Sequence, residues 1–119
     1  EFVDRRKEIA RRYDHSLSNI SVTKQKVSSD IQSSRHLYII RVPKQKHHSL
    51  FETLHREGIG VNLHYTPVHL QPYYRNLGFQ EGDYPEAEAY GYEAISLPMY
   101  PDLTNEDQDY VIETLKKHM

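Results

Sequence analysis

Apolar side chains recur along this chain at two spacings, one typical of helices and one typical of strands. A first helix is predicted over residues 1 to about 14, where charged positions alternate with an apolar stripe. The residues of that stripe are Phe2, Ile9, Tyr13 and Leu17. Residues 15–35 are polar and rich in serine, and they predict an irregular connection.

The clearest strand signal covers residues 36–42, an almost continuous run of apolar β-formers. A run that is apolar on both sides predicts a central strand with both faces covered. A helix follows over about residues 46–57, with Ser49 and Glu52 as a capping box near its start. Gly58 is expected to end this helix in the left-handed conformation.

The second half of the chain predicts shorter elements. They are a strand at 61–65, a short helix started by Pro85 and capped by Asp83, a strand at 94–97, and a last helix that begins at Thr104-x-x-Asp107. Tyr110, Val111 and Leu115 are expected to point inward from the last helix. Together the elements predict an α+β fold (an α/β sandwich), in which a small antiparallel sheet carries helices on one face.

Composition narrows the classes of function. The formal net charge of −2 gives no basic excess to hold a nucleic-acid backbone. The chain has no cysteine, which excludes disulfides and thiolate metal sites. No stretch is apolar enough to span a membrane and the start does not resemble a signal peptide, so a cytoplasmic protein is the simplest interpretation. Ten tyrosines without a tryptophan suit interfaces and sugar sites, because tyrosine joins apolar contact to a hydroxyl group.

Residues 58–74 hold the candidate chemistry on a turn-rich backbone. The candidate binding residues are His64, Tyr65, Thr66, His69 and Tyr73. A metal site is disfavoured, because Pro67 separates the two histidines and no carboxylate or thiolate lies nearby. The residues alone favour a structural role for both rings and leave ligand binding open. Of Tyr73 and Tyr74, one is expected to pack inward and the other to border the ligand, unless both belong to the core.

This stretch resembles the small C-terminal domain of the DegT/DnrJ/EryC1/StrS family of sugar aminotransferases, which use pyridoxal phosphate (PLP). It follows the family pattern GI-x-V-x-x-HY-x-P-x-H-x-x-P-x-Y. Leu77-Gly78-Phe79, Pro85-x-Ala87-Glu88 and Ser96-Leu97-Pro98-Met99-Tyr100-Pro101-x-Leu103-Thr104 repeat the family's order and spacing. The similarity covers about residues 36–117. It is closest to the branch that makes UDP-linked 4-amino-4,6-dideoxy sugars, as in pseudaminic acid or spore-coat polysaccharide pathways.

The resemblance implies a homodimeric enzyme that transfers an amino group, from glutamate, to the 4-keto carbon of a nucleotide-linked deoxysugar. Family members hold PLP in a large N-terminal domain, and its Schiff-base lysine and phosphate loop have no counterpart here. The chain begins at Glu1 without a starting methionine, and we expect a fragment with no catalytic residue and no cofactor of its own. Residues 1–34 are then a connecting helix and linker, and residues 35–119 are the small domain.

The resemblance also implies roles for individual residues. His64, Tyr65, Thr66, His69 and Tyr73 are expected to meet the nucleotide-sugar. The tyrosines expected to pack against the missing large domain or a second subunit are Tyr84, Tyr90, Tyr92 and Tyr100. The rival interpretation is a stand-alone binding or regulatory module that has the small-domain fold and no catalysis.

Overall fold

A sheet of four short antiparallel strands organises the chain. In the computed structural model, which describes residues 1–119, the strands lie in the order β1 (Thr23–Lys24), β2 (Tyr38–Arg41), β4 (Ala94–Leu97) and β3 (Asn62–Leu63). In the β2–β4 register, Tyr38 lies opposite Leu97 and Ile40 lies opposite Ile95. Because side chains alternate along a strand, these four residues share one face of the sheet.

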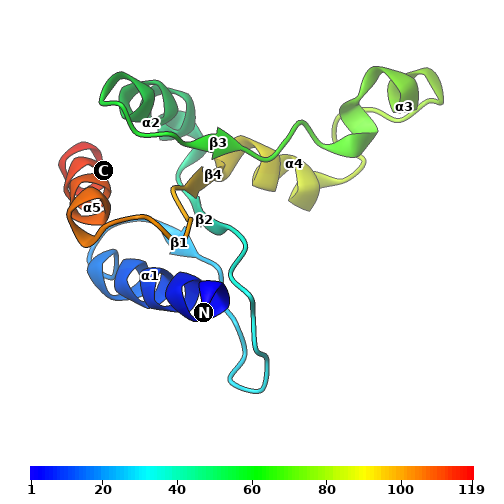
Figure 1. The fold of residues 1–119 in the computed structure, drawn as a ribbon. Coiled ribbons are helices and arrows are strands. Elements are labelled where there is room, and N and C mark those ends of the chain that lie inside the picture. The colour runs from blue at the N-terminus through cyan, green and yellow to red at the C-terminus, as the bar shows by residue number, and fades with distance from the viewer.

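Helices cover that face. They are α1 (Phe2–Ser16), α2 (Lys44–Arg56) and α5 (Asn105–His118), and they join the sheet in one core of 17 buried residues. Figure 1 shows them gathered on one side of the molecule, while α3 (Pro72–Asn76) lies far from them and α4 (Pro85–Glu93) runs between α3 and the sheet. A 3₁₀ turn, η1 (Val68–Leu70), precedes α3. The predicted α+β fold, a small antiparallel sheet with helices on one face, is confirmed. No helix has both the length and the apolar character needed to cross a bilayer.

The apolar stripe of α1 is part of this core. Ile9, Tyr13 and Leu17 are at most 1% exposed, and only Phe2, at 67%, lies open. Polar bonds fix the helix as well, since the Tyr13 hydroxyl donates to the Pro98 carbonyl at 3.0 Å. Helix α1 therefore belongs to the chain's own core, where Tyr13 packs on Tyr38 of β2 and the Gln108 side chain of α5 donates to the Ile9 carbonyl at 2.8 Å. The domain boundary between residues 34 and 35 stays a prediction.

Two predicted helix caps are wrong. Helix α2 begins directly after Pro43, earlier than expected, and the Pro43 carbonyl accepts from the N–H groups of Lys46 and His47 at 2.8 and 3.1 Å. The Ser49 hydroxyl then lies inside the helix and donates to the Lys46 carbonyl at 3.1 Å. The Asp83 carboxylate accepts from the Gln80 N–H at 2.8 Å and does not cap α4.

The last helix has its predicted cap. The Thr104 Oγ1 accepts from the Asp107 N–H at 3.0 Å, and Gly58 ends α2 with a φ of +77° as expected. Tyr110 does not point inward. It is 48% exposed, and its hydroxyl donates to the Glu57 carbonyl at 2.9 Å.

The strands are shorter than predicted, and the central one is covered on one face only. Tyr38 and Ile40 are buried under the helices, whereas Ile39 and Arg41 on the other face are only half-buried. The strand expected at 61–65 is reduced to Asn62–Leu63. The connection at 15–35 contains β1, which pairs with β2 and which the polar sequence did not indicate.

Candidate functional site

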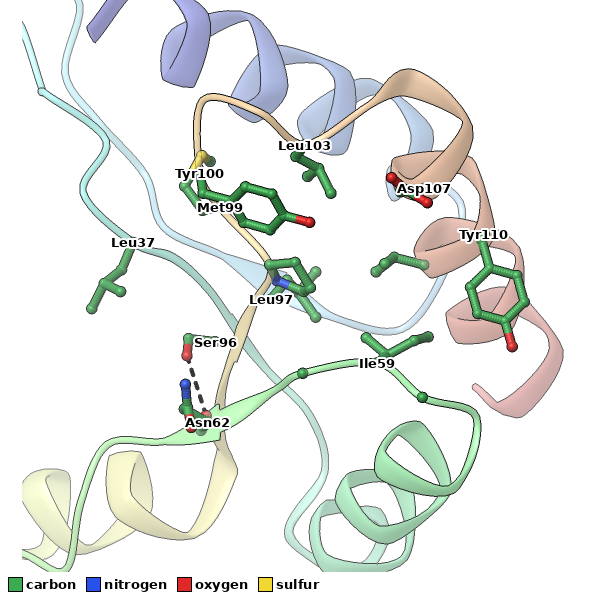
Figure 2. A pocket seen from close by; sticks show the side chains of 14 residues that line it. Leu37, Ile59, Asn62, Ser96, Leu97, Met99, Tyr100, Leu103, Asp107 and Tyr110 are labelled. Carbon is green, nitrogen blue, oxygen red and sulfur yellow. Dashed lines mark hydrogen bonds between the residues drawn. The ribbon is translucent and has the colours of Figure 1, made fainter. Parts of the chain in front are cut away.

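The chain leaves the sheet edge at His64, and β4 holds this side chain. The His64 Nε2 lies 2.8 Å from the Ser96 Oγ. The same Ser96 Oγ donates to the Asn62 carbonyl oxygen at 3.3 Å, a bond drawn in Figure 2. Ser96 is only 4% exposed and lies opposite Asn62 in the β3–β4 ladder. One ring nitrogen of His64 is therefore anchored on the sheet.

The second histidine is buried and tied to α4. His69 is 7% exposed, and its Nε2 lies 2.7 Å from the Glu88 Oε1. The hydrogen bond from His69, followed by the backbone N–H groups of Gly82 and Tyr84, holds the pKa of Glu88 below its ordinary value, while burial opposes the shift. The Tyr84 ring meets the His69 ring edge-on, with centroids 4.9 Å apart. His69 thus fixes η1 on α4, which agrees with the structural role that the residues alone favoured.

The remaining candidates lie on the surface. Tyr65 is 74% exposed and meets the His64 ring edge-on at 4.9 Å, and Thr66 beside it is exposed. Tyr73 is 68% exposed on α3, and its neighbour Tyr74 is 37% exposed. The expectation that one of these two packs inward is wrong, because both are exposed; their rings meet edge-on, with centroids 5.2 Å apart. The structure thus brings together His64 and Tyr65 and leaves Tyr73 on a separate helix.

The turn after His64 depends on a glycine in α4. A Cβ atom built on Gly91 would lie 3.0 Å from the Pro67 Cδ and 3.1 Å from the Tyr65 carbonyl oxygen. Only a residue without a Cβ lets the turn pass this close to the helix. Sequence reasoning missed Gly91, although a glycine inside a helical pattern indicates close packing.

A cavity of about 440 Å³ lies beside the His64 anchor. Ser96 and Asn62 form one wall, and Tyr100, Tyr110 and Leu37 line other parts of it (Figure 2). A cavity with both hydroxyl and apolar walls suits a ligand that carries both kinds of group. Sequence reasoning missed it, because its walls come from strands, turns and a helix that are far apart in the chain. No group of three or more possible metal ligands is present in the structure.

Comparison with known proteins gives a consistent result. The model of the DegT/DnrJ/EryC1/StrS aminotransferase family matches residues 1–116. Spore coat polysaccharide biosynthesis protein SpsC of Bacillus subtilis is 35% identical, and the match covers 94% of this chain and 31% of that protein.

Solved structures agree in fold. Spr1654 of Streptococcus pneumoniae, solved in apo, PLP and PMP forms, is 37% identical with a TM-score of 0.90, and the PLP-form match covers 98% of this chain and 31% of that one. PseC of Helicobacter pylori, an aminotransferase involved in the biosynthesis of pseudoaminic acid, is 26% identical with a TM-score of 0.86. That match covers 98% of this chain and 32% of PseC. The chain thus spans about a third of the length of these proteins.

Proposed function

Because the chain belongs to the DegT/DnrJ/EryC1/StrS aminotransferase family, we propose that it forms one wall of the sugar-binding cleft of a PLP-dependent aminotransferase. The reaction transfers an amino group from glutamate to the 4-keto carbon of a nucleotide-linked 6-deoxy sugar, in surface polysaccharide or glycan biosynthesis. The observation that carries this proposal is the turn at residues 64–67. It presents His64 and the exposed Tyr65 from a backbone held against β4 and α4.

In this proposal the chain binds and orients the sugar. Tyr65, Thr66 and Tyr73 offer exposed hydroxyl groups, and His64 offers an imidazole fixed by β4. His69 acts through structure, since its bond to Glu88 keeps η1 and the start of α3 in place. Holding a substrate in a reactive geometry supplies a large share of enzymatic rate enhancement, and covering it excludes water.

In this proposal PLP is held by the remainder of the enzyme, where it would supply the electron sink. Lys24 Nζ donates to a backbone carbonyl at 2.6 Å, and Lys46 Nζ donates to another at 2.7 Å. The Lys44 ammonium lies 4.2 Å from the centroid of the Tyr92 ring. We therefore assign no catalytic residue to this chain.

The partners proposed are the large domain of the same polypeptide and a second subunit. Tyr84, Tyr90 and Tyr100 are 50%, 37% and 48% exposed. Exposed tyrosines suit protein contacts, because each buries a large ring while its hydroxyl keeps a polar partner. Sedimentation of the complete reading frame that contains residues 1–119 tests this, and a dimer is the expected result.

The test of the function uses the same complete protein with a UDP-linked 4-keto-6-deoxyhexose and glutamate. His64→Ala and Tyr65→Phe are expected to lower kcat/KM by about two- to tenfold, the value of one neutral hydrogen bond. The PLP absorbance should stay unchanged. His48→Ala is the matched control, because His48 is an exposed histidine on α2 paired with Glu52. Normal kinetics in both site variants would contradict the assignment. Nucleotide-sugar binding without any transamination would favour the rival binding module.

A further inference from the structure

We propose that Ser96 is a positioning residue that fixes the neutral His64 ring with its proton on Nε2. Nδ1 then presents a lone pair to the ligand, and the site selects a ligand group that donates a hydrogen bond, such as a sugar hydroxyl. The part that concerns the ligand rests on the proposed function, whereas the part that concerns the tautomer does not.

The position of the proton in the neutral ring follows from counting donors. A serine hydroxyl has one proton to donate and two lone pairs that accept. Ser96 Oγ lies within reach of the Asn62 carbonyl, which can only accept, and of the His64 Nε2, which donates or accepts according to tautomer. If Ser96 donates to Asn62, His64 must donate to Ser96, and both contacts are hydrogen bonds. If Ser96 donates to His64, the contact with Asn62 becomes one between two acceptors.

Burial strengthens this preference. Ser96 is 4% exposed, so water is largely kept from replacing a missing partner. An unpaired polar group in such a place costs more than one on the surface. The arrangement that makes two bonds is therefore favoured over the arrangement that makes one.

The other ring nitrogen of His64, Nδ1, can then only accept a hydrogen bond. The His64 Nδ1 makes no hydrogen bond within the chain, and in this tautomer it only accepts. A ligand hydroxyl or N–H facing it gains a bond, whereas a ligand carbonyl or carboxylate meets a second lone pair. The group that the anchored ring recognises is therefore a hydrogen-bond donor, such as a sugar hydroxyl.

The tautomer is tested first, by nitrogen-detected NMR of the imidazole in the ¹⁵N-labelled chain, with His64→Gln to assign the signals. We expect the Nε2-protonated pattern at neutral pH, and in Ser96→Ala a shift toward the mixture of tautomers seen for a solvent-exposed histidine. An Nδ1-protonated pattern in the unmodified chain would overturn the proposal, because it would mean that Ser96 donates to His64.

The effect on the ligand is tested in the complete reading frame that contains these residues. Ser96→Ala should raise the KM for the UDP-linked 4-keto-6-deoxyhexose by about three- to tenfold with little change in kcat. Ser96→Thr, which restores the hydroxyl, should recover most of this loss. The KM for a substrate analogue that lacks the recognised hydroxyl should be the same in Ser96→Ala as in the unmodified protein.

The outcomes separate the claim about Ser96 from the proposed function. An unchanged KM in Ser96→Ala, with His64→Ala impaired, refutes the positioning role. Normal kinetics in both His64→Ala and Tyr65→Phe refute the proposed function itself, whatever the tautomer.

Discussion

Replacing Gly91 by alanine tests how the turn that carries the site is held. The glycine lies inside α4, where alanine has the higher helix propensity by about 1 kcal/mol. Propensity alone therefore predicts a more stable protein. The structure predicts the opposite, because the new Cβ would lie 3.0 Å from the Pro67 Cδ and 3.1 Å from the Tyr65 carbonyl oxygen.

The two effects can be weighed. Adding a methyl group to a site without space costs about 1–3 kcal/mol, because neighbouring groups must move by a few tenths of an ångström. Subtracting the propensity gain leaves a net loss of about 0–2 kcal/mol, centred near 1 kcal/mol. The turn should move more than the helix, since Tyr65 and Thr66 are exposed.

Urea denaturation of Gly91→Ala measures the loss, and amide chemical shifts of residues 64–67 report the movement. Gly60→Ala is the matched control, because a Cβ atom at this position would have no atom within 4 Å and the φ of Gly60 lies outside the left-handed region. We expect the control to keep its free energy of unfolding and its amide shifts in the turn. A Gly91→Ala variant as stable as the unmodified chain, with unshifted turn amides, would refute the reasoning.

Further predictions concern single bonds. Tyr13→Phe removes the bond to the Pro98 carbonyl and should lower the free energy of unfolding by about 0.5–1.5 kcal/mol in urea denaturation. Thr104→Ala removes the cap of α5 and should cost about 1 kcal/mol by the same measurement, and an unchanged stability would contradict the capping role. The pKa of Glu88 is lowered on folding, chiefly by the bond from His69, so its stabilisation is complete above its ordinary pKa of 4.5 and is lost as the pH falls through the lower folded value. The free energy of unfolding should therefore fall less steeply with decreasing pH in Glu88→Gln than in the unmodified protein. Equal pH profiles of the two proteins would disprove the linkage.

The sequence allowed the elements with strong local signals to be predicted. The apolar run around Ile40 indicated the central strand, and Thr104 indicated the start of α5 through its cap. The family motifs allowed the family and the fold to be predicted, and both are confirmed. Strand β1 could not be predicted, because two polar residues form it and only pairing with β2 makes it a strand.

The anchors of the site were beyond sequence reasoning for a related reason. Ser96 lies 32 positions from His64, and Glu88 lies 19 positions from His69, so no local spacing indicates either bond. The histidines themselves stood out by residue type. What the sequence could not separate was their roles, which depend on burial. His69 is covered by α4, whereas His64 stays half-buried beside a cavity.

The segment from η1 to α4 has its own small set of buried groups. His69, Leu70 and Glu88 are buried there, yet none belongs to the 17-residue core that joins the sheet to α1, α2 and α5. Regions with few contacts to the main core need less free energy to unfold locally than the whole molecule needs to unfold. Amide hydrogens of α3 should therefore exchange with solvent through local opening, while those of β2 and β4 exchange only when the chain unfolds. Substitutions on the exposed surface of α3 should therefore cost the rest of the fold little stability.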